Sequence, residues 1–177
     1  MKKIIAIIGR AGGGKDKAWK YFSEKLWVPT YTISSSLRII AQERGLEDTR
    51  ENLIMLWKEL KKTHGDSYLA EVLIRNCESD TMIIVGMRQI GQIIHCKKYH
   101  QTLFIWIQSD SQIRYERLKK NWKFNEDYDV FQAVEKLDEW EVQNVWKCLE
   151  YCDIMIENNW TLEEFYEKLD NISIWVK

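Results

Sequence analysis

The chain has 177 residues, of which 45% are apolar and 30% are charged, and its formal net charge is −1. This size and composition are typical of one soluble globular domain, residues 1–177, with an adequate core. A net charge near zero excludes a general field that would attract nucleic acid or an anionic membrane, so we expect neither partner. No apolar run approaches the length of a membrane-spanning helix. Four cysteines without a CxxC pair favour free thiols in a reducing cytoplasm.

The first element is a short apolar run that leads directly into a glycine-rich segment. Residues 3–8 are rich in isoleucine and predict a buried strand. The next seven residues fit the phosphate-loop pattern G-x-x-x-x-G-K, and they are Gly9, Arg10, Ala11, Gly12, Gly13, Gly14 and Lys15. Such a loop turns backbone N–H groups toward a phosphate, and its lysine reaches the outer phosphates. The alternative is a tight turn that binds nothing, but the strand before it and the helix after it favour a nucleotide site.

Four more apolar runs follow along the chain. They are residues 28–33, 82–85, 103–107 and 154–156. Because the runs are continuous rather than alternating, we expect strands that are covered on both faces, as in a parallel sheet. Strands that alternate with helical patterns predict a doubly wound α/β sheet, in which ligands bind beyond the carboxyl ends of the strands. Residues 171–177 show a weak pattern for an additional edge strand.

Polar residues mark where the predicted helices begin and end. The predicted starts are Ser34–Ser36, Asp48 with Glu51, Asp66, Ser109-Asp110, and Thr161 with Glu164, and the predicted ends are Gly45 and Gly65. Two of these starts, at Asp48 and at Thr161, have the spacing of a capping box. Residues 129–150 carry apolar side chains at helical spacing.

The segments after the other strands point to a class of phosphate-loop protein. The GTPase tetrapeptides DxxG and NKxD do not occur in the sequence. Four segments instead resemble nucleoside monophosphate kinases: Ser34-Ser35-Ser36-Leu37-Arg38, Gly86-Met87-Arg88, Arg114-x-x-Arg117, and Asp153 through Asn159. The resemblance covers nearly the whole chain and is nearest to archaeal adenylate-kinase-related proteins and the dephospho-CoA kinase-like branch.

This resemblance implies a three-layer α/β/α phosphate-loop kinase fold with a five-stranded parallel sheet. It implies an acceptor-binding helical region at about residues 34–79 and a short lid at about residues 119–130. ATP, Mg²⁺ and a phosphate-bearing small molecule, such as a nucleoside monophosphate, are the implied ligands. The residues implied as catalytic are Lys15, Arg88, Arg114 and Arg117. Those implied in nucleotide binding are Gly9 to Lys15, Asp16, Lys17 and Asn158, and those implied in acceptor binding are Ser34, Ser35, Arg38, Gly86 and Arg88.

The chemistry of phosphoryl transfer supports these roles independently. Donor and acceptor phosphates need several cations around them, and the planar guanidinium of arginine holds a phosphate through two parallel hydrogen bonds. Arg10, Arg38, Arg88 and Arg117 follow predicted strands or lie in the lid helix. Their joint placement favours a site for two phosphates over solvated surface arginines.

Three departures from the family pattern concern charge. Val85 stands where relatives carry an aspartate, and Asp16 stands where the loop usually has a serine or threonine that holds Mg²⁺. Either Asp16 coordinates Mg²⁺ in place of the missing carboxylate, which we favour, or it turns away and only stabilises the helix N-terminus. Leu137 and Trp140 stand where relatives carry lid arginines, and the available substitutes are Lys119, Lys120, Lys123 and Lys136.

The sequence therefore predicts an ATP-dependent small-molecule kinase that is a monomer or a homodimer. Two other classes stay open. One is a nucleotide-binding regulatory protein that has lost transfer activity, and the other is an ATPase that acts in an assembly. For Trp57, on the acceptor side, we expect core packing rather than stacking on a base.

Overall fold

The computed structural model describes residues 1–121, 123–137 and 145–173. Within these residues the strands form a five-stranded sheet in the order β2-β3-β1-β4-β5, and every pair is parallel. The strands are β1 (Lys3–Gly9), β2 (Thr30–Thr32), β3 (Thr81–Val85), β4 (Gln101–Gln108) and β5 (Ile154–Glu157). The predicted parallel α/β sheet is confirmed. Its second strand is shorter than expected, because Ile33 already begins the next helix.

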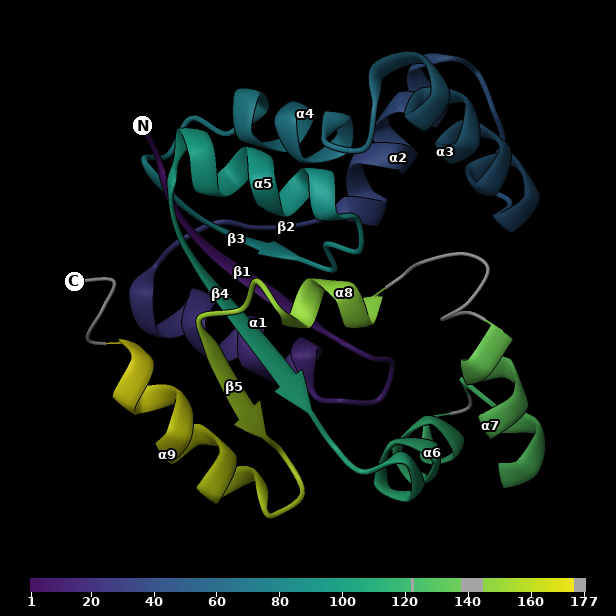
Figure 1. Ribbon diagram of the computed structural model, residues 1–177, viewed down its shortest axis with the longest axis vertical. Coiled ribbons are helices and arrows are strands. Elements are labelled where there is room, and N and C mark those ends of the chain that lie inside the picture. The colour runs from purple at the N-terminus through teal and green to yellow at the C-terminus, as the bar shows by residue number, and fades with distance from the viewer. Residues whose placement is uncertain (122, 138–144, 174–177) are drawn as a thin grey trace.

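Helices cover both faces of the sheet (Figure 1). They are α1 (Lys15–Leu26), α2 (Ile33–Glu43), α3 (Arg50–His64), α4 (Tyr68–Asn76), α5 (Ile90–Tyr99), α6 (Ser111–Lys120), α7 (Tyr128–Leu137), α8 (Val145–Leu149) and α9 (Leu162–Ser173). The apolar cluster on one face joins the sheet to α1 and α9, and the cluster on the other face joins it to α2 to α5 and α8. The α6 and α7 helices lie beyond the carboxyl end of β4 (Figure 1).

The central strand explains why the sheet forms. Residues Ile4 to Ile8 of β1 are at most 1% exposed, and their side chains alternate between the two apolar clusters. Burying a large aliphatic side chain contributes about 1.5–3 kcal/mol, so this one strand anchors both layers. Ile7 pairs with Val85 of β3 and with Ile105 of β4, which places the ends of three strands side by side.

The helix starts show where the sequence patterns succeeded and where they did not. The capping box of Thr161 and Glu164 at the start of α9 is confirmed. The box predicted at Asp48 and Glu51 is wrong, because Thr49 caps α3 by accepting a hydrogen bond from the Asn52 N–H at 3.2 Å. Asp48 instead binds Arg38 on α2. Asp48, which the local spacing predicted as a helix cap, thus forms an ion pair with a neighbouring helix instead.

Two other expectations change in the C-terminal part. The helical pattern over residues 129–150 is divided between α7 and α8, and residues 138–144, with Trp140 among them, lie outside the described residues. The weak strand pattern at 171–177 is wrong for residues 171–173, which belong to α9, and residues 174–177 lie outside the described part.

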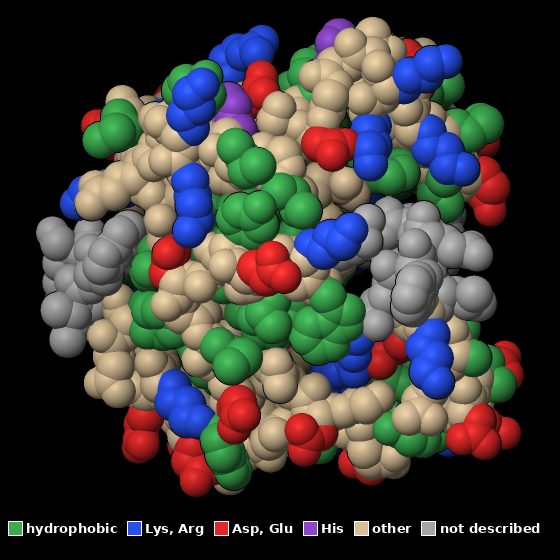
Figure 2. All heavy atoms as spheres, viewed as in Figure 1, with side chains coloured by type: hydrophobic (Ala, Val, Ile, Leu, Met, Phe, Trp, Pro, Cys, Tyr) green, Lys and Arg blue, Asp and Glu red, His purple; other side chains and the backbone are tan. Residues whose placement is uncertain are grey.

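Basic and acidic side chains are interspersed over the face drawn in Figure 2, and hydrophobic side chains gather near its centre, over α5 and α8. Ile94 of α5 and Trp146 of α8 are 50% and 40% exposed. None of the helices in the described residues is both long and apolar enough to cross a membrane.

Candidate functional site

The glycine-rich segment forms a compact loop between the end of β1 and the start of α1. Gly9 has a φ of 146°, and a Cβ atom there would lie 2.3 Å from the carbonyl oxygen of Ile107 on β4. Gly14 has a φ of 108°, and a Cβ atom there would lie 2.1 Å from the amide nitrogen of Asn158. Only glycine fits these two positions, because both combine a left-handed backbone with no room for a side chain. The strand-to-helix geometry that the loop pattern requires is therefore present.

Side chains beneath the loop hold its carbonyl groups. The Asn158 amide donates to the Gly13 oxygen at 2.9 Å, and the Ser109 hydroxyl lies 3.2 Å from the same oxygen. Arg117 lies beside them and donates to the Ser109 hydroxyl at 3.0 Å and to the Asn158 carbonyl at 3.0 Å. Asn158 was implied in nucleotide binding, and the structure places its side chain under the loop.

The anchored carbonyls determine where the loop amides point. In a planar trans peptide the N–H points away from the carbonyl of the same unit. The Gly13 carbonyl faces the floor, so the N–H of Gly14 faces the opposite side. The Ala11 carbonyl accepts a hydrogen bond from Arg114 at 3.4 Å, so the N–H of Gly12 also faces away from the floor. Backbone amides that converge at the start of a helix form a site suited to phosphate.

Arg114 is a buried charge that joins the loop to α7. It is 1% exposed and donates to the Ser109 carbonyl at 3.1 Å. Its guanidinium binds Glu135 of α7 through both terminal nitrogens, with the Nη2–Oε2 distance at 2.7 Å. The same carboxylate lies 3.7 Å from Arg10 of the loop. The side chain of Arg10 also covers the ring of Trp146 on α8, with Cζ 4.1 Å from the ring centroid.

Lys15 points back into its own loop. Its ammonium donates to the Arg10 carbonyl at 2.7 Å. Burial, and next to it the positive charge of Arg88, lower the pKa of Lys15 to about 8. Asp16 raises this pKa, while Arg114 and Lys123 lower it. Four charged side chains from separate segments thus surround the lysine.

Asp16 and Lys17 occupy the first turn of α1 and both are exposed. The Asp16 carboxylate lies 3.6 Å from the ammonium of Lys123, which belongs to the segment between α6 and α7. Val85, where the resemblance to nucleoside monophosphate kinases implied an aspartate, is 5% exposed and packs in the apolar cluster shared with Ile7. No group of three metal-binding side chains occurs among the described residues.

The acceptor-side residues lie on β3 and α2. Gly86 follows β3, and its N–H donates to the Ile7 carbonyl at 3.0 Å, which holds the next residues beside the loop. Arg88 comes two residues later, and its charge acts on Lys15. Ser34 and Ser35 lie in the first turn of α2, where both hydroxyls contact Thr32. Arg38, one turn further on, is half exposed and bound to Asp48 at 3.0 Å.

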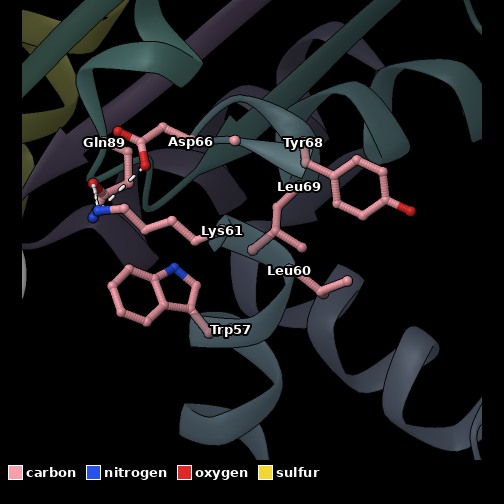
Figure 3. A pocket seen from close by; sticks show the side chains of 8 residues that line it. Trp57, Leu60, Lys61, Asp66, Tyr68, Leu69 and Gln89 are labelled. Carbon is pink, nitrogen blue, oxygen red and sulfur yellow. Dashed lines mark hydrogen bonds and ion pairs between the residues drawn. The ribbon is translucent and has the colours of Figure 1, made fainter. Parts of the chain in front are cut away.

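A small pocket lies next to this side, between α3, α4 and the start of α5 (Figure 3). It is lined by Trp57, Leu60, Lys61, Gly65, Asp66, Tyr68, Leu69 and Gln89. The Lys61 ammonium converges with Asp66 and Gln89, at 3.2 Å from each, as the dashed lines of Figure 3 show. Its cavity volume of about 10 Å³ is room for about one water. Trp57 packs against the core cluster, as expected, and its ring also faces the pocket.

Comparisons with known proteins bear on this architecture. No family model matches the chain. A relative described as a UPF0200 protein, from Hyperthermus butylicus, is 26% identical over 166 residues, covering 92% of this chain and 88% of the relative. A shikimate kinase from Acinetobacter baumannii, solved in complex with shikimate, has a TM-score of 0.62 and 13% identity over 100% of this chain and 96% of its own. A gluconokinase from Sinorhizobium meliloti has a TM-score of 0.58 and 11% identity over 98% of this chain and 95% of its own. The chain has the fold of the P-loop kinases.

The P-loop kinase fold brings most of the expected residues to one end of the sheet. Lys15, Arg88, Arg114 and Arg117 approach the loop from three strand ends. Arg38 lies on α2 and is engaged with Asp48. Sequence reasoning missed Glu135 and the Ser109 floor contact. Nothing in the sequence around Glu135 indicates that it forms a buried ion pair, because its partners Arg10 and Arg114 are distant in sequence.

The floor of the P-loop gives a first prediction. Changing Asn158→Ala removes one donor to the Gly13 carbonyl within a buried site. We expect the unfolding free energy to fall by about 1–3 kcal/mol, because the buried Gly13 carbonyl loses its shorter hydrogen bond and keeps only the Ser109 hydroxyl at 3.2 Å. Urea unfolding measures this, with Asn171→Ala on the exposed face of α9 as the control. Equal midpoints for the two variants would contradict the anchoring role of Asn158.

Lys15 gives a second prediction, in pH. Its pKa is about 8 in the folded protein, below the usual lysine value of 10.5, so the unfolded chain binds more protons between these two pH values. Stability therefore rises with pH across that range. We expect the unfolding free energy of the wild type, minus that of Lys15→Met, to increase as the pH rises from 8 to 10. The measurement is a series of urea unfolding curves of both proteins at several pH values. Contributions from titrating groups that both proteins share cancel in the difference between their unfolding free energies. A pH-independent difference would contradict the depressed pKa.

Proposed function

We propose that this protein is an ATP-dependent phosphotransferase, which moves the γ-phosphoryl group of ATP to a phosphate-bearing small molecule such as a nucleoside monophosphate. The observation that carries the proposal is the placement of Arg88 beside Lys15. The hydrogen bond from the Gly86 N–H to the Ile7 carbonyl fixes the Arg88 segment next to the loop, and the charge of Arg88 reaches Lys15. A loop for one phosphate and an arginine for a second phosphate thus lie at adjacent strand ends.

The proposed chemistry assigns separate tasks to these groups. The loop amides and Lys15 hold the β- and γ-phosphates of ATP, while Arg88 and Arg38 hold the acceptor phosphate. An oxygen of the acceptor phosphate bonds to the γ-phosphorus as the bond from that phosphorus to the β–γ bridging oxygen breaks, and ADP leaves with the electron pair. Catalysis then consists of positioning and charge neutralisation. Arg117 supplies a further cation at the base of the loop, and Arg114 acts by holding the loop.

Mg²⁺ would accompany ATP in this scheme, and the residues present fit it. Mg²⁺ in such sites is held by one or two carboxylates together with substrate phosphates and waters. Asp16 is exposed, carries a carboxylate and directly follows Lys15. When bound, the ion supplies charge neutralisation between the phosphates and Asp16.

The regions assigned from the resemblance fit the same scheme. Helices α2 to α4 cover the proposed acceptor-binding residues 34–79, and the pocket of Figure 3 lies among them. The connection from α6 to α7 covers the proposed lid at residues 119–130. An acceptor would enter by separating α3 from the start of α5, because the cavity there is now too small for a ring.

A second candidate is a nucleotide-binding regulatory protein without transfer activity. The observation that favours it is Val85, a buried apolar residue where relatives place a metal-holding carboxylate. Both proposals place a nucleotide at the P-loop, and they differ in whether a phosphoryl group is then transferred.

The deciding experiment is a coupled assay of ADP release with MgATP and a panel of nucleoside monophosphates. We expect release that depends on one acceptor, and its loss in Lys15→Met. Removing a charge-assisted hydrogen bond should weaken ATP binding by roughly ten- to a hundredfold. ATP binding without turnover on any acceptor would favour the regulatory protein, and acceptor-independent hydrolysis would favour an ATPase.

The acceptor side gives a further prediction. Arg38→Ala should raise the KM for the acceptor by about tenfold, since one cation–phosphate contact is lost, while the affinity for ATP stays unchanged. Arg44→Ala is the matched control, because Arg44 follows the same helix and is similarly exposed and paired, with Glu59. Steady-state kinetics of both variants measure the effect. Equal KM values in the two variants would remove Arg38 from the acceptor site.

A further inference from the structure

Lys123 lies at the mouth of the P-loop although it is 108 residues away from Lys15 along the chain. Its ammonium is 3.6 Å from the carboxylate of Asp16, and its charge lowers the pKa of Lys15. Both side chains of the pair are open to solvent, at 62% and 73% exposure. An ion pair this exposed contributes little to stability, so it is easily exchanged for other partners.

The backbone that carries Lys123 is well supported. The Lys123 N–H donates to the Leu118 carbonyl at 3.0 Å, and the hydroxyl of Tyr115 donates to the Glu126 carbonyl at 3.1 Å. Tyr115 and Phe131 are 7% and 3% exposed, and with Phe124 and Tyr128 they form an aromatic cluster between α6 and α7. Residues 123–131 are therefore packed against α6, and the Lys123 side chain extends from them toward the loop.

The charges around the loop change when a triphosphate binds. Asp16 is then close to several phosphate oxygens, and like charges repel unless a cation lies between them. Asp16 fits that cation as a ligand, and a carboxylate bound to a divalent ion attracts an ammonium less strongly. Lys123 thereby loses its partner at the moment when a new set of negative oxygens appears beside it.

We propose that Lys123 is the lid cation of this enzyme: Asp16 holds it in the nucleotide-free protein, and it moves to the γ-phosphoryl group when Asp16 takes up the metal ion of MgATP. This inference rests on the proposed function. It makes Lys123 a catalytic residue that contacts the transferred group, with no proton moved to or from its ammonium. It also provides a positive charge next to α7, the helix that ends in Leu137 where the resemblance implied an arginine.

Lysine labelling with an amine-reactive reagent tests the exchange directly. We expect saturating MgATP to slow the labelling of Lys123 by about threefold or more, as phosphate contact removes its solvent exposure. Lys120 is the matched control, since it is exposed at the end of α6 and should label at one rate throughout. In free Asp16→Asn, Lys123 should label faster than in the free wild type, because its partner is lost.

Lys15 in the same experiment separates this inference from the proposed function. If MgATP protects Lys15 and leaves Lys123 unprotected, nucleotide binding stands and the role of Lys123 is wrong. If neither lysine is protected and calorimetry detects no ATP binding, the proposed function itself fails, and the inference fails with it. An unchanged labelling rate of Lys123 in Asp16→Asn would overturn the resting ion pair.

Kinetics provide a second test. Lys123→Gln should lower kcat by roughly ten- to a hundredfold with the melting temperature unchanged, because an exposed charge that acts on the transferred group is lost. Lys123→Arg should restore most of the rate, and Lys98→Gln, at an exposed lysine in the last turn of α5, should keep the wild-type rate. A wild-type kcat in Lys123→Gln would contradict the proposal.

Discussion

The ion pair between Arg114 and Glu135 is the interaction on which the site depends. Arg114 is almost fully buried, and a buried guanidinium is tolerated only when a carboxylate and further acceptors surround it. Glu135 supplies the charge, and the Ser109 and Ala11 carbonyls supply the acceptors. One of those acceptors belongs to the P-loop, so satisfying the buried charge also fixes the loop. Loss of Glu135 would leave the buried charge of Arg114 uncompensated and would remove the link between the loop and α7, while Asn158 would still hold the Gly13 carbonyl.

The same carboxylate connects the loop with two helices beyond the strand ends. Glu135 belongs to α7 and lies near Arg10, whose guanidinium covers Trp146 of α8. Trp146 in turn stacks on the buried Trp106 of β4, with ring centroids 5.6 Å apart. The loop is thereby linked through Arg10 to α7 and, through α8, to the sheet. A movement of the loop on nucleotide binding would act on α7 and α8 through these contacts.

The sequence predicted the sheet and the P-loop because both depend on local patterns. Continuous apolar runs and the spacing of the loop glycines are recognisable without knowledge of the fold. The capping box predicted at Asp48 is wrong, because the Asp48 carboxylate instead binds Arg38 on another helix. Glu135 could not be found, because the charges that need it, Arg10 and Arg114, meet it only after the chain has folded. Local sequence patterns thus predict helices, strands and the glycine-rich loop, whereas the partner of a buried charge is determined by tertiary structure.

The two departures at Val85 and Asp16 differ in how the structure holds each side chain. A carboxylate at the end of β3 would be held rigidly by the sheet, but Val85 is packed there in the apolar cluster. Asp16 instead places its carboxylate in the first turn of α1, where the helix dipole stabilises it and where Lys123 reaches it. Lys123 belongs to the segment between α6 and α7, so the carboxylate that we propose as the metal ligand also forms the ion pair with that segment. In the proposed scheme, binding of a metal ion to Asp16 would therefore weaken the hold of α1 on Lys123.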